Sequence, residues 1–132
     1  MSAAANKAIV RDYFAKMTSG DTSLPDLLAD DVRWFAPPSG ELGGLYEGKE
    51  AVLGLMSQGV GLYDADVPMV LDIEQMVAED DWVCVQFVLE AKTAKGEDYR
   101  NHYHFAFQLR DGKLTYVKEY LDTQYAHEKL FS

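Results

Sequence analysis

The sequence has very little cysteine. Cys84 is its single thiol, and it lies within an apolar run. One cysteine cannot form an internal disulfide, so we predict a protein of a reducing compartment, the cytoplasm. The apolar neighbours of Cys84 favour a small buried hydrophobic side chain over a reactive nucleophile.

Positive charge is also scarce. The chain carries 12 Lys and Arg against 22 Asp and Glu, a formal net charge of -10. Such a field repels phosphate backbones and anionic lipid headgroups, so we predict neither nucleic acid nor a membrane as a partner. No apolar run approaches the roughly 18 residues of a membrane-spanning helix. The first residues, MSAAANKAIVRDYF, lack the apolar stretch of a signal peptide.

Motifs for metals and cofactors are sparse as well. His102 and His104 form an H-x-H pair, but no third histidine or nearby carboxylate completes a ligand set. Gly40, Gly43 and Gly44 lack the Lys-Ser/Thr sequence that a phosphate-binding loop needs. We therefore predict no metal site and no cofactor.

What the sequence does contain suits one domain spanning residues 1–132, since 48% of the residues are hydrophobic. In the first half, apolar residues at helical spacing predict helices, and Pro37-Pro38 stops a strand. The predicted elements are a helix over residues 3–18, a short helix over Leu24–Ala29, a strand over Val32–Ala36, a loop or frayed hairpin over residues 39–48, a helix over Lys49–Gln58 and a second loop over residues 60–67.

The second half predicts strand after strand, with Asp111-Gly112 the clearest hairpin signal. Helices followed by an antiparallel meander are typical of an α+β fold with helices on one face. Strands this long curl, so we expect a cone-shaped, mostly antiparallel sheet around the N-terminal helices, with a cavity for an apolar small molecule. The predicted strands are Met69–Ala78, Trp82–Thr93, Tyr99–Arg110 and Lys113–Asp122, followed by a capping or partly ordered tail over Thr123–Ser132.

Alternation along these strands separates inward from outward side chains. In residues 82–93 the odd positions are uniformly apolar, which predicts that they face the helices. The same parity in residues 99–110 turns Asn101 and Tyr103 inward among phenylalanines. In the last strand the parity stays open. If odd positions face inward there too, Glu119 enters an apolar cavity, where desolvation raises the pKa of a carboxylic acid into a range that suits general acid or base catalysis.

Three segments carry a family resemblance: VRDYFAKMTSGD, LLADDVRWFAPP and NHYHFAFQLRDGKLTYVKEYLDT. They resemble the SnoaL-like and ketosteroid-isomerase-like proteins over nearly the whole chain, most specifically from Asn101 to Thr123. The resemblance implies the nuclear-transport-factor-like cone, a cystatin-like fold. It implies no single reaction, because this fold hosts isomerases, cyclases, hydrolases, dehydratases and pure binding proteins.

Only some of the catalytic residues of steroid isomerases have a counterpart in this sequence. Those enzymes use a carboxylate base, with a tyrosine and a protonated aspartate as oxyanion donors. The tyrosine of the first helix matches Tyr13 and the second donor falls at Tyr103, whereas the base falls at Ala36, which cannot accept a proton. The resemblance to SnoaL-like cyclases implies an acid from the last strand instead. Glu119 and Asp122 both match that position, and Asp122 sits at a strand end, from which it could swing to the cavity mouth.

These residues lead to one functional hypothesis and one alternative. We predict an enzyme that acts without metal or organic cofactor on an apolar carbonyl or cyclic substrate, by isomerase, cyclase or hydrolase chemistry. Glu119 or Asp122 is the predicted base, and Tyr13 and Tyr103 are the predicted oxyanion donors. The alternative, which Ala36 favours, is a small-molecule-binding domain without chemistry. The predicted ligand-contacting residues are Trp34, Phe87, Asn101, Phe105 and Val117.

The outer face of the predicted sheet has a mixed character. Trp82, Val88 and Ala106 lie there among polar side chains, together with His102 and His104. A face of this kind is too apolar for plain solvent contact, so we predict a homodimer formed through it.

Overall fold

The computed structural model describes residues 2–132 of the protein. Its main helices and strands follow the predicted order, with short additional elements after the first and last of the predicted strands. No helix in this part of the chain is long and apolar enough to cross a membrane. The elements are α1 (Ala3–Ser19), a 3-10 turn η1 (Leu24–Leu27), β1 (Leu28–Ala36), β2 (Gly44–Glu47), α2 (Lys49–Val60), β3 (Val70–Glu79), β4 (Trp82–Lys92), β5 (Asp98–Arg110), β6 (Lys113–Leu121), α3 (Thr123–Ala126) and a π-helical turn η2 (His127–Phe131).

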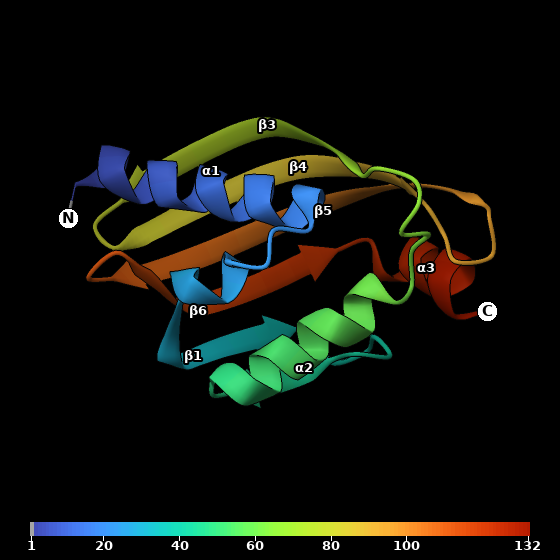
Figure 1. Cartoon of the computed structure of the whole chain (residues 1–132), viewed down its shortest axis with the longest axis horizontal. Helices are drawn as coiled ribbons and strands as arrows, with labels where there is room; N and C mark the ends of the chain where they lie inside the picture. The colour runs from blue at the N-terminus through green and yellow to red at the C-terminus, as the bar shows by residue number, and fades with distance from the viewer. Residues whose placement is uncertain (1) are drawn as a thin grey trace.

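All these strands belong to one six-stranded sheet in the order β2-β1-β6-β5-β4-β3. Neighbouring strands are antiparallel except β1 and β6, which run parallel. Figure 1 shows α1 across β3 and β4 and α2 over β1, and the same helices contact these strands. The predicted α+β fold with a mixed, mostly antiparallel sheet is therefore confirmed.

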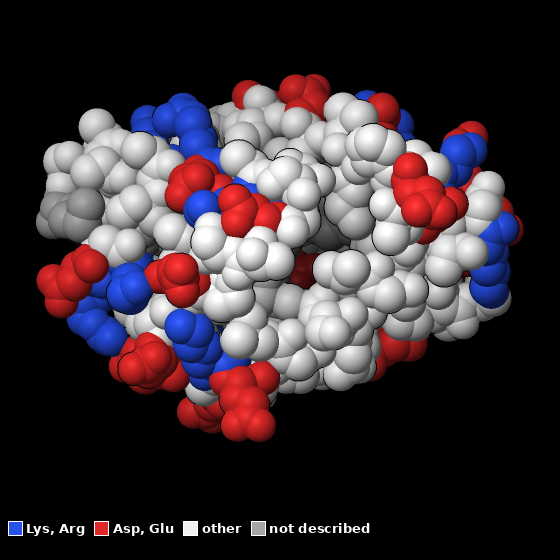
Figure 2. Space-filling model, in the orientation of Figure 1, with Lys and Arg blue, Asp and Glu red and all other residues white. Residues whose placement is uncertain are grey.

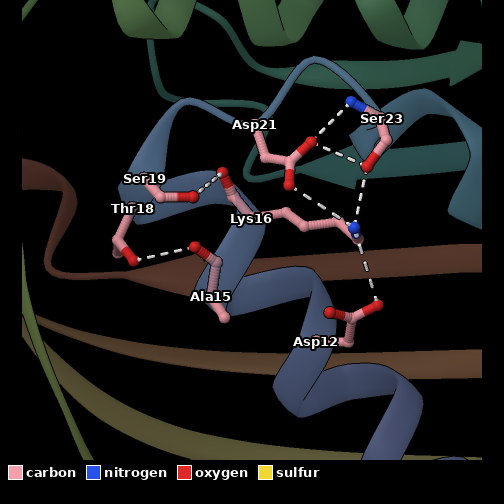
Figure 3. A network of polar contacts seen from close by, with 7 residues as sticks. All are labelled: Asp12, Ala15, Lys16, Thr18, Ser19, Asp21 and Ser23. Atoms are coloured by element: carbon pink, nitrogen blue, oxygen red, sulfur yellow. Dashed lines mark hydrogen bonds and ion pairs between the residues drawn. The ribbon is translucent and has the colours of Figure 1, made fainter.

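A polar network holds the chain where it leaves α1. The helix ends at Gly20, whose φ of 68° is left-handed and favours a residue without Cβ. Figure 3 shows the Lys16 ammonium group between Asp12 and Asp21, at 4.0 and 3.6 Å from their carboxylate oxygens. The same group donates a hydrogen bond to Ser23 Oγ at 2.7 Å. These contacts fix the direction in which the chain turns from α1 towards the sheet.

The structure differs from the sequence prediction at the start of β1. The short helix predicted over Leu24–Ala29 is a single 3-10 turn, and the strand begins at Leu28 instead of Val32. Leu28 is fully buried and pairs with Leu114 of β6. Long-range pairing with β6 therefore outweighs the local helix signals in this segment.

Two further segments are more regular than predicted. The glycine-rich stretch at residues 39–48 contains β2, which pairs antiparallel with β1. The tail over residues 123–132 is helical almost to its end. Asp122 begins this helical segment, because its side chain accepts a hydrogen bond from the backbone N–H of Tyr125 at 3.1 Å.

The odd positions of β4 and β5 face the helices, as alternation predicts. The choice left open in β6 is settled by a β-bulge, since β6 carries one extra residue opposite Gln108 and Leu109. The bulge lets Leu114 and Val117 both point into the core, although one is even-numbered and the other odd. Beyond the bulge the odd positions stay inward, and Glu119 therefore faces the helices.

Aromatic rings fill the space between α1 and the sheet. The ring of Phe14 lies 4.9 Å from Phe87 and 5.6 Å from Phe107, centroid to centroid, in edge-to-face contacts. Tyr13 makes a similar contact with Phe107 at 5.5 Å. Such pairs add stability beyond the area that they bury. They fasten α1 to the centre of the sheet.

Phe107 is the most informative core position, because it is fully buried beneath Tyr13 and Phe14. Phe107→Ala should lower the free energy of unfolding by about 3–5 kcal/mol, since it removes the ring and leaves a cavity. Urea denaturation followed by circular dichroism measures this loss. Val70→Ala is the control, at a side chain that is 58% exposed, and it should cost less than about 1 kcal/mol. Similar losses in the two variants would contradict the assignment of Phe107 to the core.

Candidate functional site

A cavity of about 220 Å³ lies between the inner face of the sheet and the segments that cover it. Residues from α1, α2, the loop after β1 and the C-terminal helical segment close it against β1, β4, β5 and β6. Figure 2 shows a hollow between the positions of α1 and α2, surrounded by uncharged residues and with an acidic side chain inside. Most lining side chains are apolar, among them Met17, Leu55, Met69, Phe87, Phe105 and Leu130.

Glu119 places a carboxyl group in this apolar space. Trp34, on the neighbouring strand β1, donates a hydrogen bond from Nε1 to Glu119 Oε1 at 2.9 Å. Burial raises the pKa of Glu119 above its ordinary value of 4.5, and the smaller, opposing effect of the Trp34 hydrogen bond lowers it. Among residues 2–132 no other group donates to this carboxyl, so its second oxygen is open to a ligand in the cavity.

Tyr13 brings a hydroxyl group to the same cavity from α1. Its side chain is 1% exposed and its ring is held against Phe14 and Phe107. Its hydroxyl is not fully buried and has no hydrogen-bond partner within the described part of the chain, and the residue lines the cavity. Burial, followed by the negative charge of Glu119, raises the pKa of Tyr13. The hydroxyl therefore stays protonated at neutral pH and can donate to a ligand.

Tyr103 supplies a second hydroxyl group from β5. Its Oη lies 2.7 Å from Tyr99 Oη and 3.5 Å from Tyr63 Oη. The ring stacks on Phe87 with an interplanar angle of 1° and a centroid distance of 5.1 Å, which fixes its position. Burial raises the pKa of Tyr103 well above 10, so this hydroxyl also remains a neutral donor.

Six of the predicted site residues line the cavity, and three do not. Asn101 is buried and donates hydrogen bonds to Tyr99 Oη and to the backbone carbonyl of Asp122. Val117 is fully buried in the core. Asp122 is exposed, and its carboxylate caps α3 at the N–H of Tyr125. The expected placement of these three residues at the cavity is therefore corrected, while Tyr13, Trp34, Phe87, Tyr103, Phe105 and Glu119 lie where expected.

Tyr63 and the C-terminal segment complete the cavity wall, and sequence reasoning did not include them. Tyr63 is the one aromatic residue of the loop over residues 60–67, a signal that could have marked it as a buried anchor. Burial raises the pKa of Tyr63. Leu130 and Phe131 of η2 line the cavity, and His127 Nδ1 lies 2.8 Å from Glu41 Oε1 in the loop after β1. This pair joins two segments that cover the cavity.

The histidine pair lies away from the cavity. His102 and His104 occupy even positions of β5, opposite Val88 and Gln86 of β4, on the outer face of the sheet. Over residues 2–132, no group of three His, Cys, Asp or Glu side chains is arranged to hold a metal ion.

The raised pKa of Glu119 makes a prediction about stability. At pH values below 4.5 the carboxyl group is protonated in both the folded and the unfolded chain, and burial adds no charge penalty. As the pH rises through the folded-state pKa, the folded chain must ionise a buried group and loses stability. Glu119→Gln removes this loss, so the variant should gain stability relative to the wild type between pH 4 and pH 8.

The gain is measured as the difference in urea unfolding free energy between the two proteins across this pH range. Glu74→Gln is the matched control, because Glu74 is exposed on β3, and its difference from the wild type should stay nearly constant. A constant difference for Glu119→Gln as well would show that burial does not raise the pKa of Glu119.

Solved structures match the chain over nearly its whole length, whereas a search of curated proteins finds no match. An NTF2-like protein from Burkholderia xenovorans LB400 is 25% identical with a TM-score of 0.78, and 98% of each chain is covered. TerC, co-crystallised with polyporic acid, is 21% identical with a TM-score of 0.83 over 97% of this chain and 99% of TerC. A protein from Bacillus subtilis described as a candidate isomerase is 18% identical with a TM-score of 0.84, over 98% and 95%.

The family assignment rests on the sequence itself. The family model of the SnoaL-like domain matches residues 10–117, which include part of α1 and most of the sheet. The NTF2-like neighbours agree with this match, and the resemblance predicted from the sequence is confirmed. The protein thus belongs to the SnoaL-like domain family and has the NTF2-like fold.

Proposed function

We propose that the cavity is the active site of an enzyme that moves a proton on an apolar carbonyl-bearing or cyclic small molecule, without a metal or organic cofactor. One observation carries the proposal: the Glu119 carboxyl group, held by Trp34, shares an apolar cavity with the hydroxyl groups of Tyr13 and Tyr103. A base and hydrogen-bond donors facing one apolar space are the groups that formation of an enolate requires.

The proposed step is a proton transfer that needs no oxidant or reductant. The ionised Glu119 takes a proton from the carbon beside the carbonyl group of the substrate. The electrons of that C–H bond form a carbon–carbon double bond, and negative charge moves to the oxygen, where Tyr13 and Tyr103 donate hydrogen bonds. Glu119 then returns the proton to the same or another carbon. Its raised pKa makes it a stronger base for this transfer than an exposed carboxylate.

The comparisons support a small-molecule role for this cavity. TerC has the same fold and was crystallised with polyporic acid, and the Bacillus subtilis protein is described as a candidate isomerase. The cavity size agrees with such a role, because about 220 Å³ exceeds the roughly 150 Å³ of an engineered apolar cavity that holds benzene. A compound with two fused rings, such as 2-tetralone, is therefore a suitable probe.

The proposal is tested by isotope exchange. The protein should accelerate the exchange of the protons beside the carbonyl group of 2-tetralone for deuterium in D₂O, followed by NMR. Glu119→Gln should slow the protein-catalysed exchange about a hundredfold or more, since it removes the base, while 2-tetralone still binds. This factor corresponds to about 2.7 kcal/mol of transition-state stabilisation.

Glu74→Gln is the matched control and should leave the exchange rate unchanged, because Glu74 is exposed on β3. If Asp122→Asn abolished exchange and Glu119→Gln did not, the base would be misassigned.

The second candidate function is a binding domain without chemistry, and Ala36 is the observation that favours it. Ala36 is buried and lines the cavity, and the resemblance to steroid isomerases places their base at this position. In a pure binding domain, Glu119→Gln changes stability while ligand affinity stays constant. Binding of 2-tetralone by the wild type with no acceleration of exchange would support this candidate and contradict the enzyme proposal.

We also propose that the protein forms a homodimer through the outer face of the sheet. Aromatic and cationic side chains meet there: the Lys118 ammonium group lies 5.3 Å from the ring centroids of both Trp82 and Tyr116. Tyr120 is 48% exposed and its ring lies 5.7 Å from that of Phe35. Aromatic side chains are enriched in protein interfaces.

Sedimentation velocity at micromolar concentration tests the dimer. Tyr120→Glu should shift the protein towards the monomer, because it places a charge in the proposed contact. Ser19→Glu adds the same charge at the exposed end of α1 and should leave the assembly unchanged. A wild-type protein that sediments only as a monomer would contradict the dimer.

A further inference from the structure

A chain of hydrogen bonds links a buried amide group to a hydroxyl group of the cavity. Asn101 Nδ2 lies 2.8 Å from Tyr99 Oη, which lies 2.7 Å from Tyr103 Oη. Asn101 and Tyr99 are each 1% exposed and do not line the cavity, whereas Tyr103 does. The chain of hydrogen bonds therefore runs from the core to the ligand space, and its three residues all occupy inward positions of β5.

The orientation of the Asn101 amide group is fixed by its partners. Asn101 Oδ1 accepts the backbone N–H of His102 at 2.8 Å, a contact that only an oxygen can make. Nδ2 donates one proton to Tyr99 Oη and the other to the backbone carbonyl of Asp122 at 3.1 Å. Because an amide nitrogen donates and does not accept, Tyr99 Oη accepts from Asn101.

This orientation decides the direction of the next hydrogen bond. Tyr99 Oη makes two close hydrogen bonds, and because Asn101 is the donor in one, the other, to Tyr103 Oη at 2.7 Å, is the close bond that can take the proton of Tyr99. The opposite direction would leave this buried O–H without a close acceptor, and an unpaired buried donor costs about 1–3 kcal/mol. Tyr99 therefore donates to Tyr103.

The proton of Tyr103 is left without a close partner. Tyr63 Oη lies 3.5 Å away, well beyond the roughly 2.7–2.8 Å usual between two hydroxyl groups. This proton is therefore held weakly and is available to an acceptor in the cavity.

We propose that Asn101 and Tyr99 are positioning residues that fix Tyr103 as a hydrogen-bond donor, so that the cavity selects ligands presenting an acceptor such as a ketone or enolate oxygen. The carbonyl character of the ligand rests on the proposed function. The direction of the chain of hydrogen bonds from Asn101 through Tyr99 to Tyr103, called the relay below, follows from the hydrogen bonds alone. The raised pKa of Tyr103 agrees with a retained proton at neutral pH.

Replacing Asn101 should reverse the relay. In Asn101→Asp the side chain accepts where Asn101 donates, so Tyr99 turns its proton towards residue 101 and accepts from Tyr103. Tyr103 then presents a lone pair to the cavity instead of a proton. Tyr99→Phe tests the same relay with less disturbance, since it removes one oxygen and leaves Tyr103 free to rotate.

Calorimetric titration of three ligands of similar shape measures whether Tyr103 presents a proton or a lone pair to the cavity. They are 2-tetralone, which only accepts, tetralin, which does neither, and 2-tetralol, which accepts and donates. All variants carry Glu119→Gln, so that no proton is removed from carbon during the titration. The Glu119→Gln protein should bind 2-tetralone about tenfold more tightly than tetralin, the scale of one hydrogen bond.

Adding Tyr99→Phe should lower this preference about threefold or more. Adding Asn101→Asp should lower it further, because only Tyr13 then donates to the ketone oxygen, and should make 2-tetralol the better ligand. The infrared carbonyl stretch of bound ¹³C-labelled 2-tetralone should move towards its value in apolar solvent in both variants, which is a direct readout of the lost donor.

Tyr125→Phe is the matched control. The ring of Tyr125 lies 5.3 Å from that of Tyr99, but the Tyr125 hydroxyl accepts from the backbone N–H of Arg100 and takes no part in the relay. It should leave the preference and the carbonyl stretch unchanged.

If Asn101→Asp does not fold, Tyr99→Phe decides alone. An unchanged preference and an unchanged carbonyl stretch in Tyr99→Phe would overturn the relay while leaving the exchange reaction of Glu119 intact. Conversely, altered ligand preference together with absent exchange would uphold the relay and overturn the enzyme proposal. Failure of 2-tetralone to bind at millimolar concentration would overturn the selection of apolar carbonyl ligands.

Discussion

The pairing of β5 between β4 and β6 is the constraint on which both the core and the cavity depend. Both neighbours pair with β5 over most of its length, so its register decides which side chains meet the helices. The inward positions supply aromatic support at Phe105 and Phe107 and the polar relay that ends at Tyr103. A slip of one residue would turn all of them outward. The apolar support and the polar site are therefore set by the same backbone hydrogen bonds.

Polar groups in an apolar cavity are costly unless they find partners. Within residues 2–132 no fully buried side-chain nitrogen or oxygen is left without one. The remaining hydrogen-bonding capacity, at Tyr13, at Tyr103 and at the second oxygen of Glu119, belongs to residues that face the cavity. Unsatisfied capacity is thus concentrated where a ligand can satisfy it, which is the physical argument for binding at this point.

Alternation was enough to predict much of this arrangement. The uniform odd face of β4 fixed the parity of β5, and the inward placement of Tyr103 and Phe105 followed. The bulge in β6 was not predictable, because the pattern around Leu114 and Val117 fits either parity until the partner strand is known. The predicted placement of Asp122 at the cavity was wrong for another reason. At the end of a predicted strand, the sequence does not distinguish a carboxylate that caps a helix from one that enters a cavity.

Asp122 nevertheless connects the site to the segment that closes it, through its backbone. Its carbonyl oxygen accepts the second proton of the Asn101 amide, while its carboxylate starts the helical segment whose residues Leu130 and Phe131 line the cavity. The Asn101 amide that orients the relay towards Tyr103 therefore also binds the backbone at the start of this covering segment. Because both bonds come from one nitrogen, moving the segment away from Asn101 would weaken the fixed direction of the relay. Closure of the cavity and the donor character of Tyr103 are in this way tied to a single buried side chain.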